Sequence, residues 1–291
     1  MYSLLASVAA FLIALMIHIN SGLIDYFGIH LSSVIIHFCG LVFITFASLG
    51  SGKRFLPKRG LSYYLYSGGF VGYFTTLFNL LAIGKISISS ILALSLMGQV
   101  MFSLFVDQFG LFGMKIRKFN LLKFFSLLLT SAGIYYMLRG TGGSIFVPVT
   151  ASVLSGFTVV LSRQLNSELS GKIGVFGAAW TNYLMGLILS SLVFIISPLF
   201  VPATKLPDYP PSFHIFLGGA IGSVIVILSN ICVSKMSSFI MTLLMFAGQV
   251  FGGLIIDSLV SGSFSLSSFV GSVFAFLGLF LIKIGEKAQA A

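Results

Sequence analysis

Long and almost uncharged apolar segments recur along the whole chain, and they constrain its fold more than any other feature. Lysine, arginine, aspartate and glutamate make up only 8% of the 291 residues, whereas roughly a quarter is usual in soluble domains. Hydrophobic residues make up 57%, and the mean hydropathy is +1.10. So few charges cannot cover a water-facing surface, which excludes a cytosolic enzyme, a secreted disulfide scaffold and a disordered protein. The +10 net charge forms no basic stripe on a soluble face, so nucleic acid is excluded as a partner.

The apolar segments have the length of helices that cross a lipid bilayer, which takes about 20 residues. They are continuous, whereas the strands of a membrane barrel are shorter and alternate between polar and apolar residues. We therefore predict an all-α integral membrane protein with ten transmembrane helices. The predicted helices span residues 3–20, 31–50, 62–83, 87–108, 122–138, 145–165, 173–197, 212–233, 238–258 and 266–284.

Lysine and arginine residues are distributed unequally between the two predicted membrane sides. Thirteen fall in the C-terminal segment or in and beside the connections between helices 2 and 3, 4 and 5, 6 and 7, and 8 and 9. Arg163 is one of them, because it flanks the predicted connection between helices 6 and 7. Only three fall on the opposite side. Because cytoplasmic loops carry the excess of basic residues, both termini are predicted to be cytoplasmic. The expected location is the plasma membrane, which in a bacterium is the inner membrane.

The two halves of the sequence match each other. Residues 68–110 align with residues 218–260 without a gap. The offset between the halves changes only in predicted connections, as a duplication of helices requires. The identical pairs include Gly68/Gly218, Gly72/Gly222, Gly98/Gly248, Gln99/Gln249 and Asp107/Asp257, and at a second offset Asn20/Asn166 and Gly28/Gly174.

Each repeat unit contains five predicted helices, an odd number, so the second unit must be inverted in the membrane. The charges agree, because the basic connection between helices 2 and 3 corresponds to one that carries Lys205 beside Asp208. We predict a first five-helix repeat at residues 1–140 and an inverted second repeat at residues 141–291. Inverted repeats are common in secondary transporters, where the substrate site lies near the midplane between the halves.

Several motifs resemble a known family over essentially the whole chain. They are an Asn20-Ser21 turn after the first helix, a Gly-Gly-x-x-Gly start at Gly68, and Gly98-Gln-Val followed by Asp107-Gln-Phe-Gly-Leu-Phe-Gly. They are similar to the YdcZ-type, EamA-like branch of the drug/metabolite transporter superfamily. The resemblance implies a ten-helix secondary carrier that works by alternating access, here as a fused pair of five-helix units. It does not imply a substrate, because the superfamily handles amino acids, sugar nucleotides, cations and drugs.

Gln99 and Gln249 are the strongest candidates for contact with a substrate. Each lies near the middle of its predicted helix, where a buried amide costs free energy unless it finds hydrogen-bond partners. A symmetric pair of amides could bind a polar substrate in a central cavity. The alternative is that they hold helices together by interhelical hydrogen bonds.

Asn79, Asn182 and Asn230 are further amides within predicted helices. They could line the same cavity, but two of them lie near helix ends, where they could face lipid headgroups instead. Trp180, the only tryptophan, could form a wall of a substrate pocket by stacking or a cation–π contact. Packing, or a place in the interfacial aromatic belt, is the alternative.

Asp107 and Asp257 end corresponding helices on opposite membrane faces, and are candidates for coupling or gating. Acidic groups within membrane segments mark proton relays, although a solvated carboxylate at a helix end is the simpler explanation. His37 and His18 lie within the first two predicted helices and could also carry protons, because histidine titrates near neutral pH. A neutral histidine bonded to a backbone carbonyl is the alternative.

The leading hypothesis is a secondary active transporter of a small polar metabolite or drug. In its most specific form, the chain exports that substrate, is coupled to protons, and works in the bilayer as a monomer or homodimer. The alternative is a non-catalytic membrane component that assists lipid-linked substrate handling or another transporter. The sequence contains no catalytic, phosphate-binding or metal-ligand motif, so we expect neither an enzyme nor a cofactor.

Overall fold

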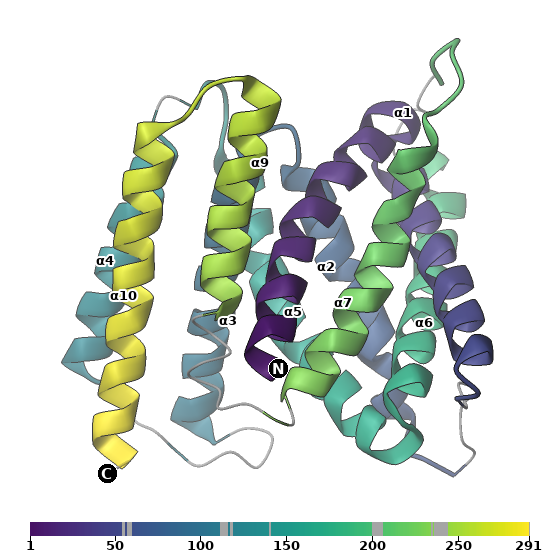
Figure 1. Cartoon of the computed structure of the whole chain (residues 1–291), viewed down its shortest axis with the longest axis horizontal. Helices are drawn as coiled ribbons and strands as arrows, with labels where there is room; N and C mark the ends of the chain where they lie inside the picture. Colours follow the sequence, from purple (N-terminus) through teal and green to yellow (C-terminus); the bar gives the residue numbers. More distant parts are fainter. Residues whose placement is uncertain are drawn as a thin grey trace.

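The computed structural model describes residues 1–53, 56, 60–110, 116, 119–139, 141–199, 206–233, 235 and 244–290, except for the side chains at 107, 233 and 282–290. Every regular element in this part of the chain is a helix (Figure 1). Six of these helices are long and apolar enough to cross a membrane. The predicted class, an all-α multi-pass membrane protein, is therefore confirmed.

The helices follow the predicted order, and each predicted span overlaps a helix. A single π-helical turn, η5 (Ala247–Phe251), leads into α9. Short 3₁₀ turns, η1 (Tyr63–Ser67) and η4 (Phe213–Phe216), precede two of the helices, and η3 (Ser197–Leu199) follows another. The α-helices are α1 (Tyr2–Gly50), α2 (Gly68–Ala82), α3 (Ile88–Phe109), α4 (Leu121–Met137), α5 (Phe146–Ile173), α6 (Val175–Ile196), α7 (Leu217–Val233), α9 (Gly252–Ser261) and α10 (Leu266–Ala290).

Two glycines at matching repeat positions turn the chain sharply in the same way. Gly28 divides the 49 residues of α1 into two helical segments and has φ 71° and ψ 174°. Gly174 separates α5 from α6 and has φ 84° and ψ 162°. Only glycine reaches this backbone conformation without steric strain. The match predicted from sequence between these two residues is therefore also a match of backbone geometry.

The predicted turn at Asn20-Ser21 is wrong. The first helical segment of α1 continues to residue 27, and α5 continues to Ile173 rather than ending at 165. Asparagine usually favours turns, because its side chain competes for backbone hydrogen bonds. Here Asn20 and Asn166 are buried inside their helices and face the glycines at the start of α7 and α2. A Cβ at Gly68 would lie 2.7 Å from Asn166 Oδ1.

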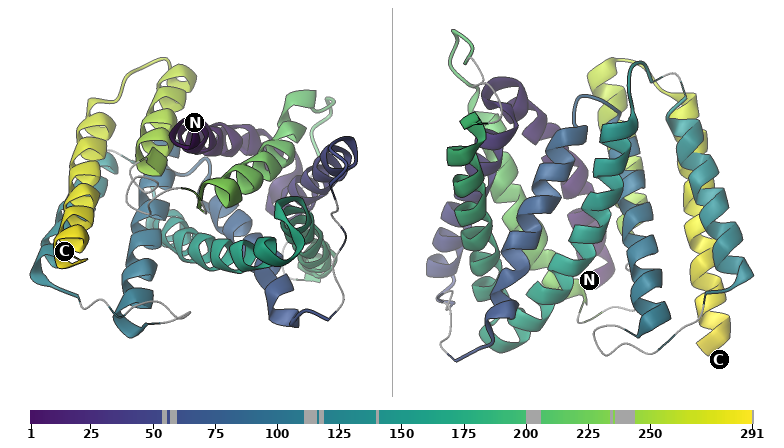
Figure 2. Two further views of the ribbon diagram at one scale, coloured as in Figure 1. Left: turned by 60° about the horizontal axis from the view of Figure 1, so that its bottom comes forward. Right: turned by 180° about the vertical axis from the view of Figure 1, so that it is seen from behind.

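The main helix contacts occur in pairs that the internal repeat relates to each other. α1 packs on α7, and the repeat-related helix α5 packs on α2, so these contacts join one half of the chain to the other. α4 and α10 lie side by side at one end of the molecule (Figures 1 and 2). At their contact, a Cβ at Gly133 would lie 2.6 Å from Gly271 O. Small residues of this kind allow close approach between membrane helices.

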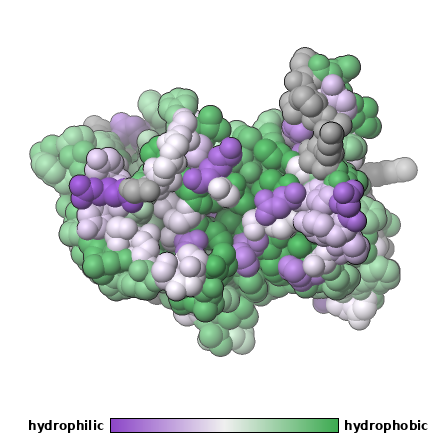
Figure 3. Space-filling model, turned by 90° about the horizontal axis from the view of Figure 1, so that it is seen from above, coloured by the Kyte–Doolittle hydropathy of each residue, from purple (hydrophilic) through white to green (hydrophobic). Residues whose placement is uncertain are grey.

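The outer surface and one end face differ in polarity. Seen from above, hydrophilic residues spread across the end face, while hydrophobic residues dominate its outline (Figure 3). Both chain ends lie in the lower half of the view in Figure 1. Much of the predicted charge bias lies outside the described residues or side chains, namely at Arg54, Lys58, Arg59, Lys115, Arg117, Lys118, Lys205, Lys283 and Lys287.

Candidate functional site

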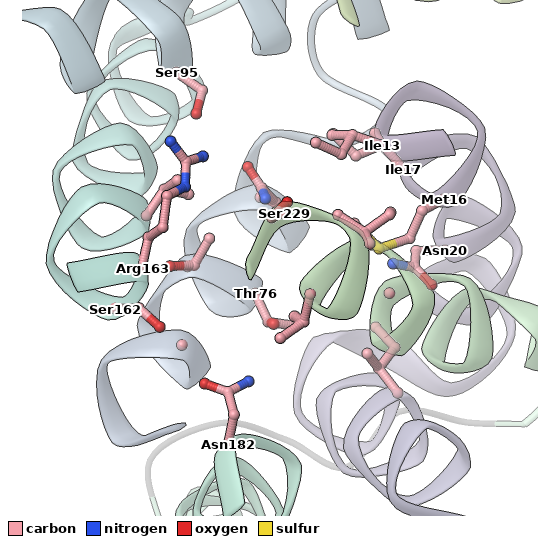
Figure 4. Close-up of a pocket in the computed structure, with 18 of the residues that line it drawn as sticks. Ile13, Met16, Ile17, Asn20, Thr76, Ser95, Ser162, Arg163, Asn182 and Ser229 are labelled. Atoms are coloured by element: carbon pink, nitrogen blue, oxygen red, sulfur yellow. The ribbon is translucent and has the colours of Figure 1, made fainter. Parts of the chain in front are cut away.

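A cavity of about 200 Å³ lies between the two halves of the chain (Figure 4). Its walls come from α1, α2 and α3 of the first half and from α5, α6, α7 and η5 of the second. At about 30 Å³ per molecule, the same volume would hold roughly seven waters. The cavity therefore suits a small molecule.

The cavity is lined by symmetry-related positions of the two repeats. Four residues on one face of α1 line the cavity, and so do the four residues at the matching positions of α5. The matching pairs are Ile13/Val159, Met16/Ser162, Ile17/Arg163 and Asn20/Asn166. A binding site between two inverted halves is expected to be lined in this way.

All five amides that the sequence singled out lie in the walls of this cavity. Gln99 lies halfway along α3, and Gln249 lies in the π-helical turn η5, where it is buried. Single π-helical turns are frequently found at functional sites. Asn79 on α2, Asn182 on α6 and Asn230 on α7 also line the cavity. Their contact with a substrate stays a prediction.

The hydrogen bonds of the cavity amides are unequally satisfied. On one side, Asn166 Nδ2 donates to Asn182 Oδ1 at 2.8 Å and to Ser162 Oγ at 3.2 Å. Elsewhere, Asn20 Oδ1, Asn79 Oδ1 and Asn230 Nδ2 are buried and have no hydrogen-bond partner among the described residues. Each such group costs about 1–3 kcal/mol. The cavity thus offers both donors and acceptors to a polar molecule.

Arg163 is the cavity residue that changes the prediction most. The sequence placed it beside a cytoplasmic connection, but α5 extends ten residues beyond it, so it lies within the helix and lines the cavity. Its Nη2 donates to Gln99 Oε1 at 3.4 Å. The prediction failed because the polar run from Ser162 to Ser167 looked like a helix end, whereas the helix continues and Ser162, Arg163 and Asn166 of this run line the cavity.

His37 also lines the cavity, where it is buried against the second half. Its Nδ1 lies 2.8 Å from Ser33 O. Because a carbonyl only accepts, Nδ1 carries the hydrogen, and Nε2 is left as the proton-accepting atom of the neutral ring. The ring lies 6.0 Å from that of Tyr183, its repeat-related position.

Two predicted site residues lie elsewhere. Trp180 is not among the cavity-lining residues, and its Nε1 donates to Thr45 Oγ1 at 3.0 Å, which connects α6 to α1. His18 is also absent from the lining, and its carbonyl accepts a hydrogen bond of 2.6 Å from Ser21 Oγ.

Asp257 has a partner that the sequence did not suggest. Its two carboxylate oxygens accept hydrogen bonds from the backbone N–H groups of Ile88 and Ser89, at 2.8 and 2.9 Å. These are the first residues of α3, where a helix favours negative charge. The side chain of Asp107, the repeat-related acid, lies outside the described residues.

Asn20, Asn166 and Arg163 are among the cavity residues that sequence reasoning missed. A signal was available in the repeat alignment. Asn20 and Gly28 match Asn166 and Gly174 without a gap between them, which indicates that the helix continues to the glycine in both halves. With the helix extended, the helical spacing of Asn166 and Arg163 places them on one face.

The family model "Putative inner membrane exporter, YdcZ" matches this sequence in two segments, residues 1–136 and 147–285. The chain belongs to this family. It is therefore a membrane transporter of the drug/metabolite transporter superfamily, and its two matched segments fit a two-repeat member of the YdcZ family.

Other comparisons concern the fold alone. No curated protein matches the sequence. A protein of known crystal structure, 15% identical to this chain, superposes with a TM-score of 0.63 over 100% of this chain and 98% of its own. At that identity, the likeness supports the fold and carries no information about the substrate.

Proposed function

We propose that this YdcZ-family chain is a secondary active transporter that moves a small polar metabolite or drug by alternating access. The observation that carries the proposal is the cavity between the halves, whose walls come from matching positions of α1 and α5. Such a cavity can open to either side if the two halves rock against each other. Gln99, Gln249, Asn79, Asn182 and Asn230 are the proposed substrate contacts.

The proposed topology has ten membrane crossings, with α1 crossing twice because Gly28 bends it. The two units are residues 1–140 and 141–291, inverted relative to each other. Both termini face the cytoplasm, and the membrane is the plasma membrane or bacterial inner membrane. The similar backbone conformations at Gly28 and Gly174 and the paired helix contacts support the two-unit division.

Export and proton coupling are the most specific parts of the proposal. The family description supports export, and His37 is the candidate proton carrier because it lines the cavity and its Nε2 lies beside Gly186 of the second half. Asp257 is the candidate gate, since its contact with the first turn of α3 joins the two halves near one end of the cavity helices. The corresponding gate on the opposite face would involve Asp107.

The test is uptake by the purified protein in liposomes, supplied with a pool of small metabolites and read by mass spectrometry. We expect saturable uptake of at least one compound, and a fall of about fivefold or more in Gln99→Ala and Gln249→Ala, because a lost buried hydrogen bond costs about 1–3 kcal/mol. Gln164→Ala is the matched control, since Gln164 is an exposed glutamine on α5.

Wild-type transport by both glutamine variants would contradict their assignment as substrate contacts. Uptake that does not respond to an imposed pH gradient would contradict proton coupling. A complete lack of uptake, together with a stable complex with another membrane protein, would instead favour the non-catalytic component.

A further inference from the structure

The two walls of the cavity occupy symmetrical positions but differ in chemistry. Where α5 presents Ser162 and Arg163, α1 presents Met16 and Ile17 at the matching positions. Figure 4 shows Arg163 on one side of the cavity, with Met16 and Ile17 on the other. At these two matching positions the duplicated scaffold therefore carries polar residues on α5 and apolar residues on α1.

The second pair of related helices repeats this asymmetry. α2 presents Thr75 and Thr76 to the cavity, whereas α7 presents Ile225 and Val226 at the matching positions. α2 packs against α5, and α7 packs against α1. At these four pairs of matching positions the polar residues therefore lie on α5 and α2 and the apolar residues on α1 and α7, while the α1 and α7 side also carries Asn20, Ser229 and Asn230.

Arg163 carries the only permanent charge among the described residues that line the cavity. Its described hydrogen bonding is limited to the long contact with Gln99, at 3.4 Å, although a guanidinium has five N–H donors in a planar fork. A hydrogen bond between helices needs no charge, so a neutral side chain would serve that purpose at lower cost in a membrane interior.

No described carboxylate neutralises Arg163. Glu168 binds Lys172 at 3.5 Å and accepts a hydrogen bond of 2.9 Å from Tyr64. Asp257 binds the first turn of α3, while Asp25 and Asp208 are exposed. Asp107 lies eight residues beyond Gln99 on α3, or about 12 Å along the helix axis.

Arg163 also lies deep within the molecule. It is ten residues, or about 15 Å, from the end of α5 at Ile173. Gln99 is eleven residues, or about 16 Å, from the start of α3 at Ile88. Because the hydrocarbon core of a bilayer is about 30 Å thick, the contact between the two side chains lies near its middle, where the proposed transport function requires the substrate.

We propose that the cavity binds a small organic anion, with its carboxylate or phosphate group at Arg163 and Gln99 and its apolar part against α1 and α7. This inference rests on the proposed transport function and names its substrate class. The guanidinium fork matches two oxygens of either acid group. Thr75, Thr76 and Asn79 supply further polar contacts on the same side. The volume of about 200 Å³ suits a free solute rather than a lipid.

Binding is tested on the purified full chain in detergent, by thermal shift and calorimetry, with matched probes. 3-Methylbutanoate carries the acid and the branched apolar part, 3-methylbutanamide lacks the charge, and acetate lacks the apolar part. Monobutyl phosphate and butanol form a second pair, and dihexanoyl phosphatidic acid represents a lipid headgroup. We expect the two soluble amphipathic anions to stabilise the protein, and the neutral compounds, acetate and the lipid to have little effect.

Substitutions of cavity-lining residues test whether the anions bind in the cavity. Arg163→Gln should weaken binding of 3-methylbutanoate about 10- to 100-fold, the usual loss for a hydrogen bond to a charged group. Arg163→Lys keeps the charge without the fork and should restore part of the affinity. Met16→Ser introduces the serine found at the matching position of the second repeat. It should weaken the binding of 3-methylbutanoate and leave the small effect of acetate unchanged. Arg139→Gln is the control, because Arg139 is exposed beside the Tyr136 ring.

Several outcomes would overturn the inference. They are equal stabilisation by 3-methylbutanamide, undiminished binding in Arg163→Gln, stabilisation by the lipid alone, and no stabilisation by either soluble anion. Transport of a neutral metabolite without anion binding would remove this inference and leave the transport proposal standing. If the protein binds anions through Arg163 but transports nothing, this inference stands and the transport proposal is contradicted.

Discussion

At the scale of single residues, Asp257 shows how one side chain can join two halves of a molecule. Its carboxylate binds the backbone N–H groups of Ile88 and Ser89, which lie at the positive end of the α3 dipole. Ser87 completes the cap, because its side chain accepts a hydrogen bond from the backbone N–H of Ser90. The compensating partner that a carboxylate near a helix end requires is therefore another helix.

Replacing Asp257 by asparagine should destabilise the protein. One charged acceptor is lost, and the amide donor group faces backbone N–H groups, so the expected cost is roughly 1–2 kcal/mol. The measurement is the midpoint of thermal unfolding in detergent, with Asp208→Asn as the control because Asp208 is exposed. An unchanged midpoint in Asp257→Asn would mean that the contact contributes no stability.

At the scale of secondary-structure elements, the crossing of α3 and α5 brings Gln99 and Arg163 together. The two helices meet at glycines, and a Cβ at Gly156 would lie 2.6 Å from Gln99 N. A Cβ at Gly98 would clash with the carbonyl of Val153 on the other helix. Because these glycines have no side chain, the two backbones approach closely enough for the long side chains beside them to face one cavity.

Gly156→Ala should therefore separate α3 from α5. We expect a loss of about 1–3 kcal/mol, typical of overpacking, and weaker anion binding because the guanidinium moves away from Gln99. Gly171→Ala on the same helix has no atom near the added Cβ, and should be neutral or stabilising by up to about 1 kcal/mol. Thermal unfolding of both variants gives the comparison. Similar behaviour of the two would contradict the proposed close approach.

At the scale of the whole molecule, the decisive proposed property is the inversion of the second half. Two connections that match in sequence must then lie on opposite sides of the membrane. Ser51 lies exposed after the end of α1, and Ser212 lies exposed before α7. Ser51 begins the connection from α1 to η1, and Ser212 ends the corresponding connection from η3 to η4.

A membrane-impermeant thiol reagent can test the inversion. In a background with Cys39 and Cys232 replaced by serine and alanine, we expect intact cells to leave Ser51→Cys unlabelled and to label Ser212→Cys. Inside-out vesicles should reverse the pattern, because the basic connections are expected to be cytoplasmic. Labelling of both cysteines from the same side would disprove the inverted arrangement.

The sequence by itself determined the class of the protein and which residues of its two halves correspond to each other. A scarcity of charge over segments of bilayer length leaves only membrane helices, since no other element satisfies its own backbone hydrogen bonds in lipid. The internal repeat predicted that Gln99 and Gln249 are equivalent, and both line the cavity. It also matched Gly28 with Gly174. Both residues have a positive φ, a conformation that strongly favours glycine, so the same residue type occurs at the same bend in both halves.

The tertiary structure alone decided which side of each helix faces the cavity and where two helices end. Asn20 and Asn166 were predicted to lie in turns, because asparagine has a high propensity for turns. Both are helical in the structure, where they pack against glycines of α7 and α2. The same extension of α5 moved Arg163 from a membrane edge to the cavity wall. Hydrophobic periodicity could not show this, because a membrane helix is apolar on its lipid face as well as its packed face. Only the contacts between helices distinguish the two faces, and they are a property of the folded chain.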